Sequence, residues 1–330
     1  MPEPVQRAAV IGVWAGFGGA AMAAGPLVGG ILIQLFDWRS IFLANLLLGM
    51  LGMWLTWGIA SERRRMPARS LDLAGQGTAI VALGTLIAVL IEAPAYGWRS
   101  APILTGCVVS AAAAIMFLML ERHRLQPMLP LSFFRNGTFS GATLVSLASA
   151  LTFYGLVFVL SLYFQQQKHY SPLRTGLAFL PLTALVAAGS IVSNRLVSRY
   201  GARRLVFAAL GLYAAGFLGL LVATLASSYW LLALPMPAVG FAAGLITPAA
   251  TAALMTAIEQ ERAGIAAGVL NSARQTGAAL GVAIFGAMIA SVQSFQAGMQ
   301  LALWVAAAAS LAVALAWRLA LAQAPAPSLL

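Results

Sequence analysis

Ten long apolar segments occupy most of this 330-residue sequence and restrict its fold more than any other feature does. An α-helix needs about 20 apolar residues to cross the hydrocarbon core of a bilayer, and each segment reaches that length. Charged residues form only 8% of the chain, whereas soluble domains average about 25%. We therefore predict an all-α polytopic membrane protein of about ten transmembrane helices. The predicted segments are 8–36, 41–60, 73–93, 101–120, 139–165, 174–194, 204–225, 229–254, 263–290 and 298–320.

Basic residues are divided very unequally between the two ends of the predicted helices. Fourteen arginines lie in one set of connections and four basic residues in the other. The positive-inside rule then places both ends of the chain in the cytoplasm. The same distribution argues against a nucleic-acid partner, although a net charge of +11 alone would suggest one. The larger set is Arg7, Arg63, Arg64, Arg65, Arg69, Arg122, Arg124, Arg135, Arg195, Arg199, Arg203, Arg204, Arg262 and Arg318, and the smaller set is Arg39, Arg99, Lys168 and Arg174.

Residues that could support catalysis or bind a metal are scarce. Cys107 is the single cysteine, so it forms no intrachain disulfide. His123 and His169 are far apart in the sequence. No nucleophile and base occur at a usable spacing, and we expect neither enzymatic activity nor a metal site or cofactor.

Residues 16–45 begin as an apolar helix that is rich in glycine. Pro26 removes a backbone N–H and is expected to kink this helix. The glycines remove side chains, so another helix can lie closely against this one. Glycine and proline are also common in membrane helices generally, and composition alone leaves that alternative open. The residues concerned are Gly16, Gly25, Pro26, Gly29 and Gly30.

This order of glycines and proline resembles the antiporter motif on the fifth helix of major facilitator superfamily exporters. The loop text that follows, WRSIFLAN (38–45), resembles the fourteen-helix drug:proton antiporter branch of that superfamily. Three later stretches resemble further signatures: 170–181, which begins YSPL, 194–204, NRLVSRYGARR, and 267–283, AGVLNSARQTGAALGVA. In the second of these, Ser198 stands where the family loop has a carboxylate, so we expect a weakened or differently made cytoplasmic latch.

The resemblance implies a partial major facilitator fold that lacks the first four of fourteen helices, as in an N-terminally truncated copy. Residues 1–60 would be the last two helices of the N-terminal lobe, and 61–120 a linking helix hairpin. Residues 121–322 would form a six-helix C-terminal lobe, and 323–330 a disordered tail.

The activity that the resemblance implies is multidrug efflux, the export of drugs or other amphiphilic small molecules by proton antiport. The proton gradient would supply the energy, without a cofactor. The implied location is the bacterial inner membrane, and a periplasmic adaptor protein is an implied accessory partner.

Two polar features could serve such a transporter in the first half of the chain. Glu92 is a candidate for proton coupling because carboxylates near the apolar zone are costly and often functional. It lies only two residues before Pro94, however, so a position at the watery outer interface is the alternative. A second feature is one helical face that mixes aromatic rings with hydrogen-bonding groups, and it suits either an amphiphilic ligand or ordinary packing. Its members are Tyr154, Phe158, Ser161 and Gln165.

Two further polar features lie in later segments. Thr247 and Pro248 predict an interrupted helix that is either a flexible gating element or a static kink. Arg274 should lie well inside the bundle, with Asn271 on its face, where a neighbouring helix would supply carbonyls or a carboxylate. Its role could be substrate contact, proton coupling or bracing. Asp72, by contrast, is predicted to cap a helix rather than to carry protons.

Two functional hypotheses remain from the sequence. The first is a transporter that exports amphiphilic compounds by proton antiport. The second is a truncated membrane protein that does not transport, because rocking of two six-helix lobes about a central site would need helices that this sequence does not match.

Overall fold

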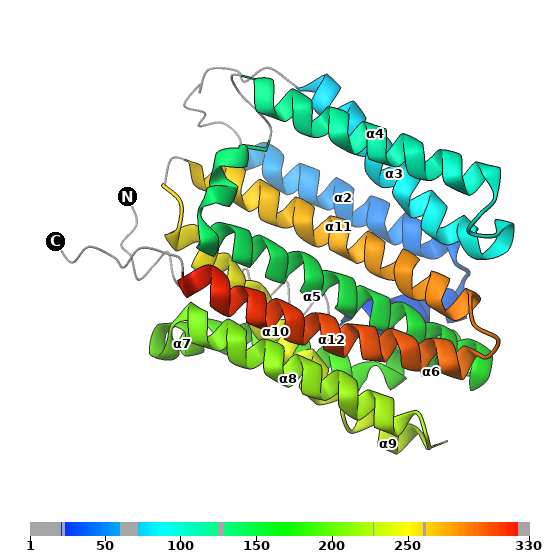
Figure 1. The fold of residues 1–330 in the computed structure, drawn as a ribbon. Coiled ribbons are helices and arrows are strands. Elements are labelled where there is room, and N and C mark those ends of the chain that lie inside the picture. Colours follow the sequence, from blue (N-terminus) through cyan, green and yellow to red (C-terminus); the bar gives the residue numbers. More distant parts are fainter. Residues whose placement is uncertain are drawn as a thin grey trace.

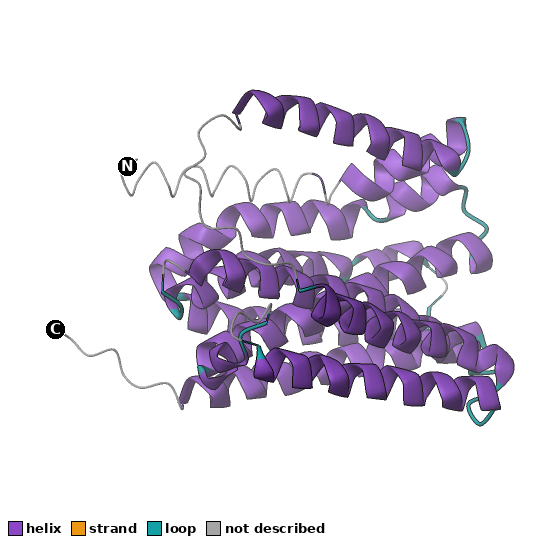
Figure 2. Cartoon of the chain, turned by 90° about the horizontal axis from the view of Figure 1, so that it is seen from above, coloured by secondary structure: helices purple, strands orange, loops and turns teal. Residues whose placement is uncertain are grey.

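The computed structural model describes residues 21, 24–59, 72–124, 129–226, 228–259 and 262–322. Helices form almost all of this part of the chain, and Figure 2 shows no strand in it. Within the described residues, nine candidate spans are long and apolar enough to cross a membrane, and a shorter apolar helix covers Ala24–Leu35. The predicted all-α membrane fold is therefore confirmed, while most of the first predicted segment, 8–36, lies outside the described residues.

The long helices run antiparallel to their neighbours in the chain (Figure 1). Their boundaries agree with the predicted apolar segments to within a few residues at most ends. They are α2 (Arg39–Ile59), α3 (Leu73–Tyr96), α4 (Ala101–His123), α5 (Gly137–Leu162), α7 (Leu180–Tyr200), α8 (Ala202–Ala223), α10 (Met236–Thr256), α11 (Ala263–Ala290) and α12 (Phe295–Ala322). The short elements are η1 (Leu131–Arg135), η2 (Tyr163–Gln167), α6 (Pro172–Ala178) and α9 (Tyr229–Ala233).

Three predicted segments are broken in the structure. The segment 174–194 divides into α6 and α7 at Phe179, and 229–254 divides into α9 and α10. Pro181 and Pro237 lie at the start of the second helix in each pair, where a missing N–H costs no hydrogen bond. The segment 139–165 ends in a π-helical turn, η2, instead of continuing as an α-helix. Two of these three segments nevertheless remain single candidate spans, Gly137–Gln167 and Tyr229–Thr256.

The stretch 194–204, expected to be a loop, is also almost entirely helical. Helix α7 continues to Tyr200 and α8 begins at Ala202, so Gly201 alone forms the turn. Its φ of 80° lies in the left-handed region that favours glycine. Ser198 lies on α7, where its hydroxyl donates to the Asn194 carbonyl at 3.0 Å.

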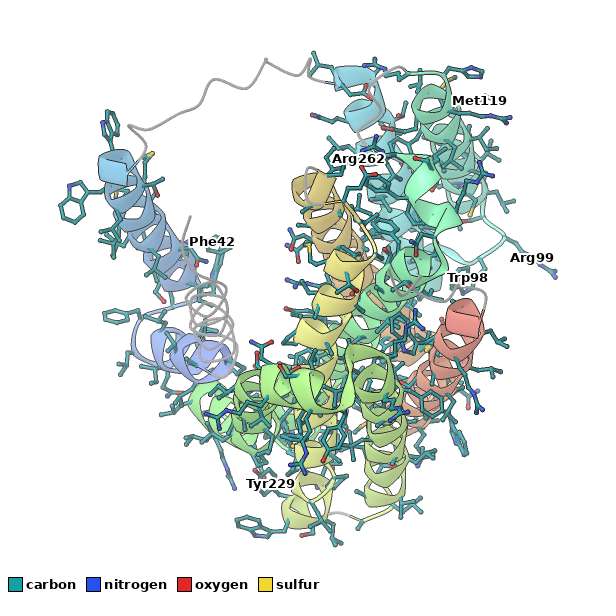
Figure 3. The ribbon with its side chains drawn as sticks, turned by 90° about the vertical axis from the view of Figure 1, so that its left-hand side faces the viewer. Phe42, Trp98, Arg99, Met119, Tyr229 and Arg262 are labelled. Carbon is teal, nitrogen blue, oxygen red and sulfur yellow. The ribbon has the colours of Figure 1, made fainter. Side chains whose placement is uncertain are left out.

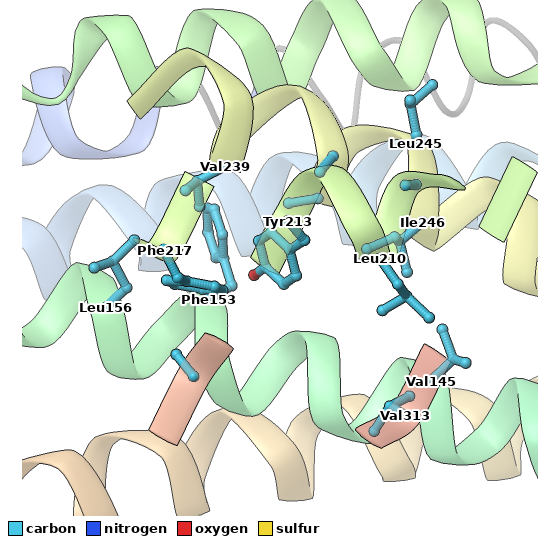
Figure 4. Close-up of a cluster of buried hydrophobic side chains, with 14 of the residues drawn as sticks. Val145, Phe153, Leu156, Leu210, Tyr213, Phe217, Val239, Leu245, Ile246 and Val313 are labelled. Carbon is cyan, nitrogen blue, oxygen red and sulfur yellow. The ribbon is translucent and has the colours of Figure 1, made fainter. Parts of the chain in front are cut away.

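Six helices, α5, α7, α8, α10, α11 and α12, share one hydrophobic core. Figure 4 shows part of it, where Phe153 and Leu156 of α5 meet Phe217 of α8. Tyr213 is completely buried there, and its hydroxyl donates to the Ser149 carbonyl at 3.2 Å. Burial of a polar group is tolerated when it is hydrogen-bonded. The core therefore joins α5 to α8 by a polar contact as well as by packing.

Glycines bring pairs of these helices into backbone contact. On α11, a Cβ at Gly277 or Gly281 would overlap the carbonyls of Leu147 and Leu151 on α5. On α10, Gly244 approaches α7 in the same way. Small residues at helix contacts are typical of membrane bundles, where close packing replaces the hydrophobic effect.

The hairpin α3–α4 packs against the six-helix core through α11. Asp72 caps α3, as predicted, because the Gly75 N–H donates to its Oδ1 at 2.7 Å. The same oxygen lies 3.1 Å from Nη1 of Arg124, so an ion pair closes the base of the hairpin. The Ser110 hydroxyl donates to the Ala82 carbonyl at 2.8 Å and joins the two helices midway.

Helix α2 contributes least to the packing. Within Arg39–Trp57, none of the span is buried. Figure 3 shows α2, with Phe42, standing apart from α10 and α11. The two-lobe division predicted from the resemblance remains a prediction for this part of the chain.

The described basic residues are again divided unequally between the two ends of the bundle. Helices α6 and α9 and the α3–α4 turn mark one end in Figure 1, which we call the α6 end. By the direction of each helix, the α6 end carries Arg39, Arg99, Lys168 and Arg174, and the opposite end carries Arg122, Arg124, Arg135, Arg195, Arg199, Arg203, Arg204, Arg262 and Arg318. The structure therefore keeps the alternation on which the predicted orientation depends.

Candidate functional site

The glycine-rich helix Ala24–Leu35 crosses α6 with backbone in contact with backbone. A Cβ on Gly30 would lie 2.6 Å from the carbonyl oxygen of Pro172, closer than real Cβ atoms approach. Likewise, a Cβ on Gly176 would lie 2.5 Å from the carbonyl oxygen of Pro26. The residue order shows that the two helices run antiparallel. We call this contact, formed by Pro26, Gly30, Pro172 and Gly176, the glycine seam.

The seam separates the residues of the predicted antiporter motif into two groups. Pro26 and Gly30 contact α6, whereas a Cβ added at Gly25 or Gly29 would meet no neighbouring heavy atom within 4 Å. Gly16 lies outside the described residues. The expectation that glycines admit a neighbouring helix therefore holds at Gly30, and α6 is that neighbour.

The predicted mixed face of α5 is the less buried side of that helix. Tyr154 is 40% exposed, while Phe158 and Ser161 are half-buried and Gln165 is exposed. The Gln165 side-chain amide donates to the Ser161 hydroxyl at 3.0 Å. Phe158 packs beside Gly286 of α11. Aromatic and hydrogen-bonding groups thus share one open face, as the spacing predicts.

Several hydroxyl groups bond to the backbone of α10 around its internal proline. Pro248 lies inside the helix. The Thr251 hydroxyl donates to the Thr247 carbonyl at 2.9 Å, and the Thr247 hydroxyl is 3.5 Å from the Ala243 carbonyl. From α7, the buried Ser193 hydroxyl donates to the Leu245 carbonyl at 3.0 Å. These bonds stabilise the helix around a proline that removes one of its own hydrogen bonds.

Arg274 is half-buried on α11 rather than enclosed by the bundle. Its Nη2 lies 3.4 Å from the amide oxygen of Asn271, which is itself exposed. Among the described residues, no carboxylate forms an ion pair with it. The expected close approach of another helix at the nearby small residues does occur, since Gly277 and Gly281 of α11 meet the backbone of α5. Because this face of α11 is partly exposed, the guanidinium group of Arg274 can contact a ligand or another helix that approaches the face.

Glu92 does not join these groups into one cluster. It is exposed near the end of α3, shortly before the Gly97 turn, whereas Arg274 lies in the first half of α11. Among the described residues, no group of three or more His, Cys, Asp or Glu side chains could hold a metal ion. The candidate site is therefore a set of helix faces and a seam, and its described residues form no compact catalytic cluster.

Sequence reasoning missed the partner of the glycine helix. The partner is α6, whose text SPLRTG (171–176) contains the proline and glycine that the seam requires. In the sequence this text stands out only by its resemblance to a signature. The signal available in the sequence was a second proline and glycine, Pro172 and Gly176. Nothing in either stretch indicates that the helix of Gly30 and α6 are in contact.

These features define an all-helical membrane protein with a shared six-helix core. The chain belongs to the Major Facilitator Superfamily, whose family model matches residues 2–282. The predicted family is thereby confirmed.

Several relatives are resistance proteins. The chain is 35% identical over 320 residues to a methylenomycin A resistance protein of Streptomyces coelicolor, and 36% identical over 317 residues to one of Bacillus subtilis. These alignments cover 96% and 94% of this chain and 67% of each relative. The multidrug resistance protein Stp of Mycobacterium tuberculosis is 34% identical over 227 residues, which are 69% of this chain and 42% of Stp.

Proposed function

We propose that this chain exports amphiphilic small molecules across the bacterial inner membrane by proton antiport, with both termini in the cytoplasm. The support from relatives is that those with 34–36% identity carry the names of methylenomycin A and multidrug resistance proteins. For a membrane protein of the Major Facilitator Superfamily, export of the toxic compound would account for resistance of this kind. The periplasmic adaptor remains a prediction from the family resemblance alone.

The observation that carries the proposal is the glycine seam. Its contacts are between backbone atoms, with Gly30 against Pro172 and Gly176 against Pro26. Because the atoms nearest to these two glycines are backbone atoms of the facing helix, we infer that the two helices can part and close again there. Contacts of this kind suit alternating access, in which bundles of helices rock against one another around a central site.

The polar faces supply the remaining parts of the mechanism. Tyr154, Phe158 and Gln165 offer aromatic and hydrogen-bonding surface to an amphiphilic compound, as small-molecule sites generally do. Pro248 lets α10 bend because it removes the helical bond to the Gly244 carbonyl, and the Thr247 hydroxyl lies beside it, 3.5 Å from the Ala243 carbonyl. Arg274 would brace and gate the open side, and Glu92 is the candidate for proton coupling among the described span residues.

Efflux of a fluorescent amphiphile from bacteria that lack their main exporters tests the proposal. Cells that express the full chain should lose preloaded dye faster than cells with an empty vector, and an uncoupler should abolish the difference. The matched control is Arg274→Ala at equal membrane abundance, which should abolish efflux. Unchanged dye retention at confirmed membrane insertion would favour the alternative, a membrane protein that does not transport.

A further inference from the structure

Helix α5 ends at the α6 end in an unusual chain reversal. In η2 the Lys168 N–H donates to the Tyr163 carbonyl at 3.0 Å, five residues back, as in a π-helix. The Tyr170 N–H then donates to the Phe164 carbonyl at 2.9 Å. Between them His169 has a φ of 53°, a left-handed conformation that non-glycine residues rarely adopt. π-Turns within α-helices are rare and frequently occur at functional positions.

The reversal places aromatic rings around Phe164, which is 1% exposed. The Tyr170 ring lies parallel to it, at a centroid distance of 5.7 Å and an interplanar angle of 4°. Phe179 meets Phe164 edge-on at 5.7 Å, and Tyr229 lies tilted at 6.2 Å. The guanidinium carbon of Arg174 lies 4.0 Å from the centroid of the Tyr170 ring. Stacked rings and an arginine over a ring both attract beyond simple burial.

In the sequence, the residues that make these contacts lie within α6 or on either side of it. Tyr170 precedes Pro172, the first residue of α6, whereas Arg174 lies within α6 and Phe179 follows it directly. Helices of seven residues are unstable by themselves because too few hydrogen bonds offset the cost of nucleation. The position of α6 therefore depends on what holds its two ends, and Phe164 contacts residues on both sides of it.

We propose that Phe164, Tyr170 and Arg174 are positioning residues that hold α6 in place at the glycine seam. The stack fixes the two ends of α6 to the π-turn of α5, and α6 carries Gly176 against Pro26. Movement of the end of α5 is transmitted through the stack to the seam. The inference concerns the contact between the ring stack and α6. It rests on the proposed function only where the experiment measures export.

Thr175 provides a reporter for the position of α6. It is 4% exposed, and its hydroxyl has no hydrogen-bond partner among the residues that the structure describes. Thr175→Cys therefore introduces a thiol of similar size without breaking a hydrogen bond. Cys107, which is exposed, is replaced by serine so that position 175 carries the single thiol. The rate of alkylation by N-ethylmaleimide in membranes then measures how often α6 exposes this position.

Tyr170→Leu should raise the alkylation rate at position 175 about tenfold, because it removes the ring stack and the cation–π contact together. Tyr170→Phe keeps the ring and should leave the rate unchanged. Phe217→Leu is the matched control, since it replaces a fully buried ring of the core whose ring partner is Tyr213, at a centroid distance of 4.6 Å.

Equal rates for Tyr170→Leu and Tyr170→Phe would overturn the proposal. It would also be overturned if Phe217→Leu raised the rate as much, because the effect would then be general loosening of the fold. Neither outcome depends on transport. If the chain shows the expected alkylation pattern but no dye efflux, the result would contradict the proposed export function. The positioning role of the ring stack would still be supported.

Discussion

A methyl group added at Gly30 should prevent the glycine seam from closing fully. The Cβ of Gly30→Ala would lie 2.6 Å from the Pro172 carbonyl oxygen and 3.2 Å from the Leu173 Cα. Ordinary van der Waals contact begins at 3.4 Å, so the oxygen must move by 0.8 Å (3.4 − 2.6). Both opposing atoms belong to the backbone, and a rotamer change cannot relieve the overlap.

The cost can be estimated from overpacked helix contacts, which typically lose about 1–3 kcal/mol. A free-energy difference of that size changes an equilibrium by about 5- to 150-fold. We therefore expect Gly30→Ala to lower the ratio of closed to open seam by a factor within that range. The open form of the seam should then be more populated than in the unmodified protein, even without substrate.

Alkylation of Thr175→Cys in the Cys107→Ser background measures this change. Gly29→Ala is the matched control, because the neighbouring position has no heavy atom within 4 Å of its Cβ and the added methyl meets open space. Gly30→Ala should accelerate alkylation at least fivefold over Gly29→Ala, with uncoupler-sensitive efflux reduced in parallel. Equal alkylation rates in the two variants would refute the reasoning that the seam is sterically limited at Gly30.

Three further predictions concern contacts elsewhere in the fold. Gly281→Ala should lower the free energy of unfolding of the purified protein by about 1–3 kcal/mol, because the added Cβ would overlap a backbone carbonyl of α5. Gly268→Ala on the same helix is the control, since its Cβ would meet open space and should not destabilise the protein. Asp72→Ala should destabilise the start of α3 by about 1 kcal/mol through loss of the cap, with faster local hydrogen exchange, and it also removes the ion pair with Arg124. Arg124→Gln removes the ion pair alone, so a smaller effect of that change would show that the cap contributes in addition to the pair. Arg274→Lys should retain part of the efflux that Arg274→Ala abolishes. Full resistance in cells that express Arg274→Ala at normal abundance would show that this residue has only a packing role.

Much of the fold could be predicted from the sequence because membrane spans depend on apolar length. The spans from α2 to α12 begin and end near the predicted segments, and Asp72 caps α3 as its position at a segment start suggests. The breaks at Phe179 and Leu234 could not be read from hydropathy, since the residues on both sides are apolar. Pro181 and Pro237 were the signals there, because each lies in the first turn of the second helix.

The candidate site was predicted less completely. The glycine at position 30 indicated close packing, but periodicity within one helix does not identify the opposing helix, and α6 lies more than 140 residues away in the sequence. For Arg274 the expected burial followed from its distance along the helix, yet the structure leaves this side of α11 open, with Asn271 as its contact. Burial of one helix face depends on which helices surround it, and the pattern of a single segment contains no such information.

Transport by the purified full chain in liposomes tests the central claim most directly. An inside-acidic pH gradient would be imposed, and uptake of an amphiphilic dye would be followed together with a pH-sensitive probe in the lumen. The account predicts that dye accumulates only with the gradient and that its uptake makes the lumen less acidic, because protons leave in exchange. Dye uptake that is equal with and without the gradient, or equal to that of protein-free liposomes, would contradict export by proton antiport.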